Sequence, residues 1–335
     1  MPAVAGDTAS GASALIGQRW QAIDPLLPPP GAGGSHCGAQ LAVAAPGRLA
    51  TGSCEHWAGA PGSMDLTWGA ARRFQLTAQV AGPDVSGALD ALLTQWRDHL
   101  ADVPEAGGED TAAVVNWPSR DIDGVKPLLR HGLVPLAVIA ARAAGGLPGA
   151  QAARQQQSGS APDASPDPQA AGGLRIRLAE SADLDAVVRL GLEVIRFDAH
   201  FGTVIERPFT ADALRGEAAG LLAGPDGWTW LAERDGEPIG VLYAEQPRAA
   251  AWIAPMAGPA PAAYLELMGV APGERGQGVG AALVSRFHRE ADAAGVAVTL
   301  LHYERVNPLS APFWSQQGYR PLWSTWEARP ARHLR

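Results

Sequence analysis

The chain has 335 residues, enough for two domains of ordinary size, and its formal net charge of −8 comes with no basic run or basic patch interleaved with aromatic residues. This composition argues against nucleic acid as a partner. Cys37 and Cys54 lack the spacing of metal ligands and there is no long apolar run, so we expect no metal, no membrane partner and a cytoplasmic location.

Residues 1–143 predict a first α/β domain that opens on a short helix over residues 15–27. Residues 40–45 and 48–57 are separated by Pro46 and Gly47, and this pattern predicts a β-hairpin. The elements expected after the hairpin alternate between strand and helix: strand 71–80, helix 88–100, strand 111–116, helix 125–131 and strand 133–141.

Residues 144–172 are rich in Gly, Gln, Ser, Pro and Ala, which is typical of a linker between domains. The second domain, 173–335, begins with strand 174–178, and Ser181 is the expected N-cap of the helix that follows. The later elements share the same alternation: helix 210–223, hairpin 229–245, strand 264–268, helix 281–294, strand 296–303, helix 310–317 and strand 319–328.

A glycine-rich turn between strand 264–268 and helix 281–294 is the most informative stretch of the chain. Gly276, Gly278 and Gly280 bring bare backbone to the start of the helix, and Arg275 adds a fixed positive charge. The first N–H groups of a helix have no partners within the helix, and the helix dipole favours an anion there. This turn therefore predicts a site for a phosphate or pyrophosphate group.

The spacing of the turn decides between known phosphate-binding motifs. No Lys follows the glycines as a P-loop requires, and Leu283 stands where a dinucleotide fingerprint needs its last glycine. The pattern Arg275-x-x-Gly278-x-Gly280 resembles instead the acetyl-CoA signature of the GCN5-related N-acetyltransferase (GNAT) superfamily. A second segment, from Asn307 to Tyr319, resembles the family's N-x-x-A-x-x-[LF]-[YW]-x-x-x-G-F motif.

The resemblance implies an α/β (α+β) fold with a central mixed, largely antiparallel β-sheet flanked by helices, and acetyl-CoA as cosubstrate. It also implies a set of residues that contact this cosubstrate: Met268, Gly269, Val270, Arg275, Gly276, Gln277, Gly278, Val279, Gly280, Asn307, Ser310, Phe313 and Trp314.

The chemistry of acetyl transfer points to further candidates. The attacking amine must lose a proton, and the resemblance favours Glu266 as the base because strand alternation places it on the face of Met268 and Val270. A Glu paired with an Arg or facing solvent is the alternative. Trp314 stands where many relatives have an acidic Tyr, so Tyr303 or His302 is the substitute, unless the thiolate leaves without an acid.

The acceptor pocket is expected near residues 197–202, where Asp198 and His200 are candidates for binding a cationic amine. Both residues also suit ordinary capping and packing. Trp228, Trp230 and Trp252 are expected to be packing residues. The acceptor itself is expected to be a small molecule or peptide that carries an amine.

The first domain repeats the second half of this plan in outline. Val80 precedes Asn116 by 36 positions, and Val270 precedes Asn307 by 37, with a turn, a helix and a strand between them in both copies. We therefore infer a tandem of two GNAT-like domains, the first of them degenerate. Its turn lacks a counterpart of Arg275, and Asp84 stands where a phosphate would approach and can cap the helix instead.

Two function classes follow from the sequence. The favoured one is an acetyl-CoA-dependent N-acetyltransferase that moves an acetyl group to a primary amine by direct attack in a ternary complex. The alternative is a non-catalytic acyl-CoA-binding or scaffolding protein. The expected oligomeric state is a monomer or a homodimer.

Overall fold

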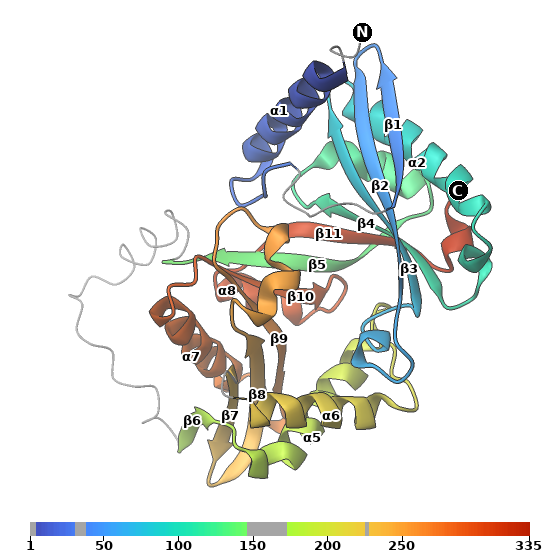
Figure 1. Ribbon diagram of the computed structural model, residues 1–335. Coiled ribbons are helices and arrows are strands. Elements are labelled where there is room, and N and C mark those ends of the chain that lie inside the picture. Colours follow the sequence, from blue (N-terminus) through green and yellow to red (C-terminus); the bar gives the residue numbers. More distant parts are fainter. Residues whose placement is uncertain (1–4, 31–37, 146–172, 225–227) are drawn as a thin grey trace.

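The computed structural model describes residues 5–30, 38–145, 173–224 and 228–335, with side chains from residue 13 onward (Figure 1). The expected linker 144–172 lies outside the described residues except for its first two positions, and so does Cys37. Cys54 is buried and is a free thiol.

The described part of the first half contains a β-hairpin at one edge of the sheet, three further strands and three helices. Its elements are α1 (Ala5–Ile23), β1 (Ala39–Ala45), β2 (Arg48–Ala58), β3 (Arg72–Ala81), α2 (Val85–Ala101), β4 (Thr111–Pro118), α3 (Val125–Arg130) and β5 (Val134–Ala143). The first helix begins before the predicted position, because the pattern of small residues ahead of Leu15 does not indicate a helix although the chain adopts one.

The second half follows the predicted order closely. Its elements are β6 (Leu174–Leu178), α5 (Leu184–Asp198), α6 (Thr210–Ala223), β7 (Trp228–Arg234), β8 (Glu237–Glu245), β9 (Ala262–Val270), α7 (Val279–Ala293), β10 (Val298–Glu304), α8 (Ser310–Gln316) and β11 (Arg320–Ala328). Ser181 is not the N-cap of α5. It lies in a 3-10 turn, where Asp183 accepts a hydrogen bond from the backbone N–H of Glu180 at 2.7 Å.

The strands in the described residues form one sheet of eleven, in the order β1-β2-β3-β4-β11-β5-β10-β9-β8-β7-β6. Among these strands, only the pairs β3–β4 and β9–β10 are parallel, so the sheet is mixed and largely antiparallel, as predicted. β5 and β11 cross the middle of the molecule between the two groups of strands (Figure 1).

The two halves exchange their last strands. β11, from the second half, pairs with β4, and β5, from the first half, pairs with β10. Trp326 of β11 is buried in the core beneath α2, and Val138 of β5 is buried in the core beneath α7. Each half therefore completes the hydrophobic core of the other.

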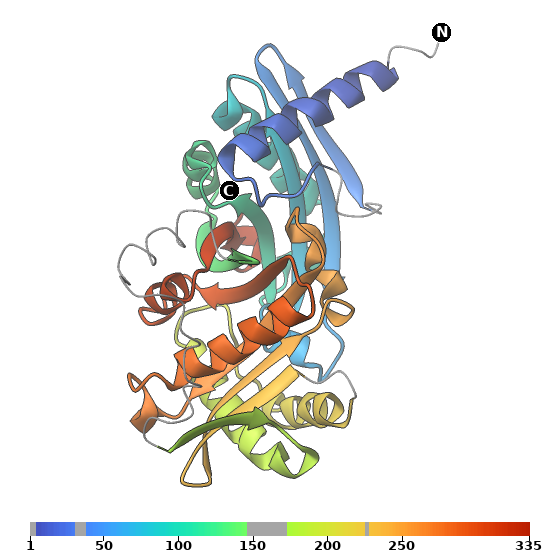
Figure 2. The ribbon, with the colours of Figure 1, turned by 90° about the vertical axis from the view of Figure 1, so that its left-hand side faces the viewer.

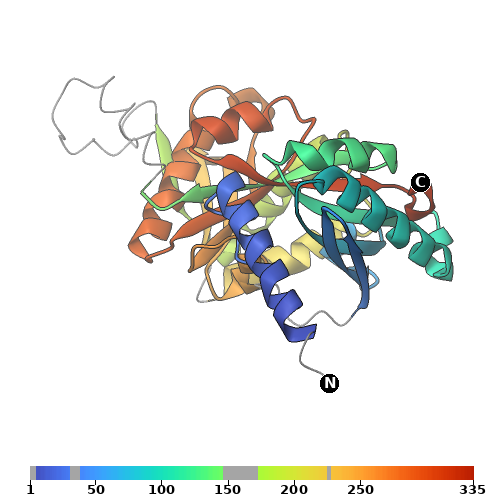
Figure 3. The same ribbon diagram turned by 90° about the horizontal axis from the view of Figure 1, so that it is seen from above.

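Helices cover both faces of the sheet. α1 runs along one face of the upper strands and α2 along the other, with the hairpin β1–β2 between them (Figures 2 and 3). In the lower part, α5 and α6 pack on one face and α7 on the opposite face (Figure 1). Within the described residues, no helix is long and apolar enough to cross a membrane.

Candidate active site

A cavity of about 1010 Å³ lies where β9 and β10 separate. The two strands pair only from Ala262 to Leu265 and from Val298 to Leu301, and beyond these positions they diverge. β9 stays paired with β8, and β10 stays paired with β5, so the split leaves one edge of each strand unpaired. Such an edge presents backbone N–H and C=O groups to whatever occupies the cavity.

One end of the cavity is the start of α7, built as the glycine pattern predicted. Gly278 is the N-cap with φ +82°, and Gly276 has φ +75°, conformations that favour glycine over residues with a Cβ. No side chain caps this helix, so its first N–H groups face the cavity without a capping partner. Gly280 has another role, because a Cβ there would lie 3.3 Å from the Phe313 ring.

The loop before α7 is held in shape by side chains. Arg275 Nε donates to the carbonyl oxygen of Val270 at 3.1 Å, and its guanidinium lies 5.2 Å from the centre of the Phe197 ring. Gln277 does not line the cavity. It accepts a hydrogen bond from Arg234 at 2.9 Å, and Arg234 also pairs with Glu274, so Arg234 is a supporting residue that the sequence reasoning missed.

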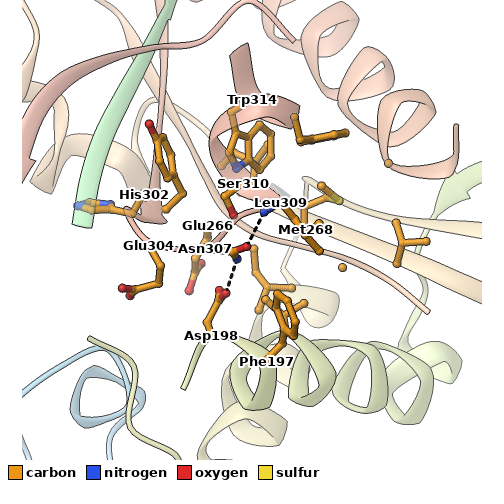
Figure 4. Close-up of a pocket in the computed structure, with 18 of the residues that line it drawn as sticks. Phe197, Asp198, Glu266, Met268, His302, Glu304, Asn307, Leu309, Ser310 and Trp314 are labelled. Carbon is orange, nitrogen blue, oxygen red and sulfur yellow. Dashed lines mark hydrogen bonds between the residues drawn. The ribbon is translucent and has the colours of Figure 1, made fainter. Parts of the chain in front are cut away.

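α8 forms one wall of the cavity, with Ser310 and Trp314 among its lining residues (Figure 4). Phe313 and Trp314 pack edge to face with ring centres 4.9 Å apart, and Trp314 also packs against Tyr319. Trp314 is buried at 7 % exposure, in the same core cluster as Val279 and Leu283 of α7. The Asn307–Tyr319 segment therefore packs beside the start of α7.

Asn307 and Asp198, predicted for different roles, are brought together. The amide of Asn307 donates to Asp198 at 2.9 Å and accepts from the N–H of Leu309 at 3.0 Å (Figure 4). Both amide groups are therefore already paired within the protein. Burial raises the pKa of Asp198 to about 6, against the opposing effects of Asn307 and Arg275.

Glu266 lines the cavity at a β-bulge. Leu267 pairs with Tyr243 and Leu265 with Ala244, which leaves Glu266 without a partner on β8. The expected alternation fails at this bulge: Met268 and Val270 pack on the core beneath α7, whereas Glu266 interacts with Glu217 of α6 on the opposite face. Bulges often re-aim side chains in this way next to active sites.

Three carboxyl groups meet at this end of the cavity: Glu217, Glu245 and Glu266. Burial, and then the neighbouring Glu217 and Glu245 carboxylates, raise the pKa of Glu266 well above its usual range. Burial also raises the pKa of Glu217 and of Glu245. A carboxyl group with a raised pKa is suited to take a proton near neutral pH.

Two candidate acids lie on β10 at the mouth of the split. Burial raises the pKa of Tyr303, which lines the cavity. His302 accepts or donates a hydrogen bond at 3.0 Å with the Tyr264 hydroxyl, and desolvation by the cavity walls lowers its pKa to about 4. His302 is therefore neutral at pH 7. His302 and Tyr303 are neighbours in β10, so their side chains point to opposite faces of the sheet. Both still line the cavity, because the split opens it to both faces.

The structure does not bring His200 to the cavity. Its ring nitrogen Nδ1 contacts the carbonyl oxygens of Arg196 and Phe197 at the end of α5, and the side chain is exposed. Trp228 and Trp230 pack in the core as predicted, but Trp252 is 59 % exposed and lines the cavity.

Several cavity residues were missed by the sequence reasoning, and they share no motif spacing: Asp65, Arg73, Glu217, Glu245, Tyr264 and Glu304. Asp65 and Arg73 come from the first half of the chain, so this half forms one wall of the cavity. Glu304, at the end of β10, accepts from Thr203 at 2.9 Å, and burial raises its pKa to about 7.

The corresponding turn of the first half is closed to anions. Asp84 caps α2 by accepting from the N–H of Gly87 at 2.9 Å, as predicted, and it pairs with Arg48 at 2.6 Å. These two hydrogen bonds lower the pKa of Asp84. A carboxylate therefore occupies the place at the helix start where a phosphate would bind.

Residues 197–319 match the model of the acetyltransferase (GNAT) family. This segment contains the cavity's glycine loop, the split between β9 and β10 and the α8 wall. No curated protein sequence matches the chain significantly.

One solved structure shows a similar fold over most of the chain, and others resemble it more weakly. A GCN5-related N-acetyltransferase from Sphaerobacter thermophilus is 14% identical with a TM-score of 0.51, over 84% of this chain and 76% of that one. One from Kribbella flavida is 14% identical with a TM-score of 0.44, over 94% of both chains. A paia N-acetyltransferase from Thermoplasma acidophilum, in complex with coenzyme A, is 15% identical with a TM-score of 0.35, over 47% of this chain and 98% of that one.

Proposed function

We propose that the protein is an acyl-CoA-dependent N-acyltransferase that transfers an acetyl group to a primary amine within a ternary complex. The observation that carries the proposal is a single cavity joining the uncapped start of α7 to a carboxyl-rich chamber through the split between β9 and β10. A phosphate-binding end and a proton-accepting end, connected by a passage with free backbone groups, are what acyl transfer from a CoA thioester requires.

The cosubstrate would lie along α7 and α8. The N–H groups that start α7 suit the pyrophosphate, with Arg275 released from Val270 to add its charge. Met268, Phe313 and Trp314 offer an apolar surface to the pantetheine arm. The thioester would then reach the split, where an unpaired N–H of β9 can donate to the carbonyl oxygen as negative charge develops there.

The transfer itself needs one proton acceptor. The amine nitrogen attacks the thioester carbon, the carbon–sulfur bond breaks, and the amine's proton passes to Glu266 directly or through water. CoA leaves as a thiolate, which takes its proton from solvent or from Tyr303, the candidate acid on β10. We assign no proton transfer to His302, because its pKa of about 4 leaves it neutral throughout.

We further propose that the two halves are a tandem of GNAT-like domains with boundaries near residues 143 and 173, and that only the second binds CoA. The Asp84 cap in the first half supports this assignment because it fills the anion position with a side chain. The first half would instead shape the acceptor chamber through Asp65 and Arg73.

An amine-dependent thiol-release assay tests the function. Purified protein is mixed with acetyl-CoA and a set of primary amines, and free CoA thiol and the acetylated amine are both measured. We expect thiol release that requires the amine and matches the acetylated product. Release of no thiol with any amine, in a protein that still binds acetyl-CoA, would support the non-catalytic alternative instead.

A further inference from the structure

The acceptor chamber brings together three carboxyl groups that have no ion-pair partner among the described residues. Glu217 on α6, Glu245 at the end of β8 and Glu266 on β9 interact electrostatically with one another. None of the three forms an ion pair with an Arg, Lys or His in the part of the chain that the structure describes. Grouped carboxyl groups out of water are unfavourable unless a cation joins them.

Orphaned polar atoms lie at the same place. The Tyr243 side chain is only 2 % exposed, and its hydroxyl has no hydrogen-bond partner among the described residues although it interacts with Glu266 and Glu217. Oε2 of Glu217 is likewise buried without a partner there. Such atoms destabilise a protein unless a ligand completes their hydrogen bonds. An ammonium group, with three donors, can serve several carboxylate oxygens together, next to the buried Tyr243 hydroxyl.

An aromatic ring completes this part of the chamber. Trp252 lines the cavity at 59 % exposure, and its indole N–H donates to Glu245 at 2.7 Å. The ring also packs edge to face on Tyr264, with ring centres 5.1 Å apart. A cation beside Glu245 would therefore meet a fixed aromatic surface, which adds cation–π attraction to the charge pairing.

The cations of the chamber do not balance its carboxyl groups. Arg73 lines the same end, but its guanidinium donates to the backbone carbonyl of Asp65 at 2.9 Å and lies 4.3 Å from the centre of the Trp57 ring. Its charge is offset by the Asp65 and Glu327 carboxylates. Among the described residues, no group of three or more His, Cys, Asp or Glu side chains has the geometry to hold a metal ion. The geometry suits an organic cation.

We propose that the acceptor is a small diamine or polyamine, in which a second ammonium group is held by Glu217, Glu245 and Trp252 while Glu266 serves the amine that is acetylated. This inference rests on the proposed function. The second ammonium group takes no part in bond making, so it stays charged and fixes the position of the reacting amine.

Three acceptors with the same four-carbon chain test the proposal: the diamine putrescine, the monoamine butylamine and the zwitterion γ-aminobutyrate. We expect kcat/KM for putrescine to exceed that for butylamine by at least about tenfold, the ratio that one modest charged contact provides. We expect γ-aminobutyrate to be the poorest, because its carboxylate would face those of the chamber.

A matched pair of variants locates the effect. Glu245→Gln keeps the shape of the side chain and removes its charge, so we expect the preference for putrescine over butylamine to fall about tenfold. Glu237→Gln makes the same change at the exposed opposite end of β8 and should leave the preference intact. A preference that survives Glu245→Gln would overturn the proposal.

The proposal and the function on which it rests can fail separately. Equal kcat/KM for putrescine and butylamine would overturn the diamine assignment and leave the acyltransferase standing. Absence of thiol release with every amine would overturn the function. Calorimetric titration of putrescine into the CoA-loaded protein then tests the diamine assignment without relying on turnover. The assignment requires that putrescine binds, that Glu245→Gln weakens this binding and that Glu237→Gln does not.

Discussion

At the scale of single residues, Glu266 is the group on which the proposed catalysis depends most. Its bulge turns it toward Glu217, and burial there raises its pKa well above the usual range. Glu266→Gln cannot accept a proton, so we expect kcat to fall by about 10²–10⁴-fold while acetyl-CoA affinity is unchanged. Steady-state kinetics and calorimetry on the same preparation measure both quantities, and an undiminished kcat would remove Glu266 as the base.

The protonation of Glu266 also predicts a pH profile. Because burial and the neighbouring carboxylates raise its pKa well above the usual range, the ionised base forms at a higher pH than an ordinary Glu requires. We therefore expect kcat/KM of the wild-type protein to rise with pH above that usual range, and the residual activity of Glu266→Gln to lack this rise. A profile of identical shape in both proteins would assign the titration to another group.

Glu304 predicts a dependence of stability on pH. Burial raises its pKa from 4.5 to about 7, so the folded protein holds a proton that the unfolded chain has released between these values. The stability of the folded state is then highest below pH 4.5 and falls as pH rises through 7. The loss attributable to Glu304 is on the order of 3–4 kcal/mol, because the pKa rises from 4.5 to about 7 and each pH unit corresponds to about 1.4 kcal/mol.

The neutral variant Glu304→Gln should remove this dependence and can still accept the Thr203 hydrogen bond. Urea unfolding at pH 5 and pH 8 measures the effect: the wild-type protein should lose more unfolding free energy between the two values than the variant does. Parallel losses would show that Glu304 is ionised in the folded protein.

At the scale of elements, the loop before α7 depends on backbone conformation. Gly278 has φ +82° and caps the helix, so Gly278→Ala places a Cβ in a conformation that costs about 1–2 kcal/mol and shifts the N–H groups of the first turn. We expect acetyl-CoA affinity to fall about tenfold. Gly273→Ala is the control, because Gly273 lies in the same loop without a positive φ and with open space around it. Equal affinities for both variants would contradict the loop assignment.

The elements and their order could be predicted from sequence because their signals are local. The Asp235–Gly236 turn, the apolar spacing of α7 and the glycines before it each act over a few residues. The partners of β5 and β11 could not be predicted, because both apolar strands suit either half of the sheet. Their exchange is decided by tertiary packing.

The same limit applies to the site. The residues proposed to face CoA lie in or next to two motifs and were predicted from them, although Gln277 turned out to support the loop from outside the cavity. Glu217, Glu245 and Asp65 have no such spacing and meet only in the folded chain. The bulge at Glu266 reversed its expected face, since alternation holds only where a strand is regular.

At the scale of the whole molecule, the strand exchange makes the halves interdependent. Without β11 the first half loses Trp326 from its core, and without β5 the second half loses Val138. We expect fragments 1–145 and 173–335 to fold poorly alone and to form a one-to-one complex when co-expressed. Size-exclusion chromatography and circular dichroism measure this, and two fragments that each unfold cooperatively on their own would contradict the interdependence.

The central claim is that the chain has one CoA site, located in its second half. Calorimetric titration of acetyl-CoA into the purified protein, beside an Arg275→Ala variant, tests it most directly. The account predicts one site per chain, with markedly weaker binding in the variant because the phosphate end loses its positive charge. Two sites per chain, or an affinity that Arg275→Ala leaves unchanged, would contradict it.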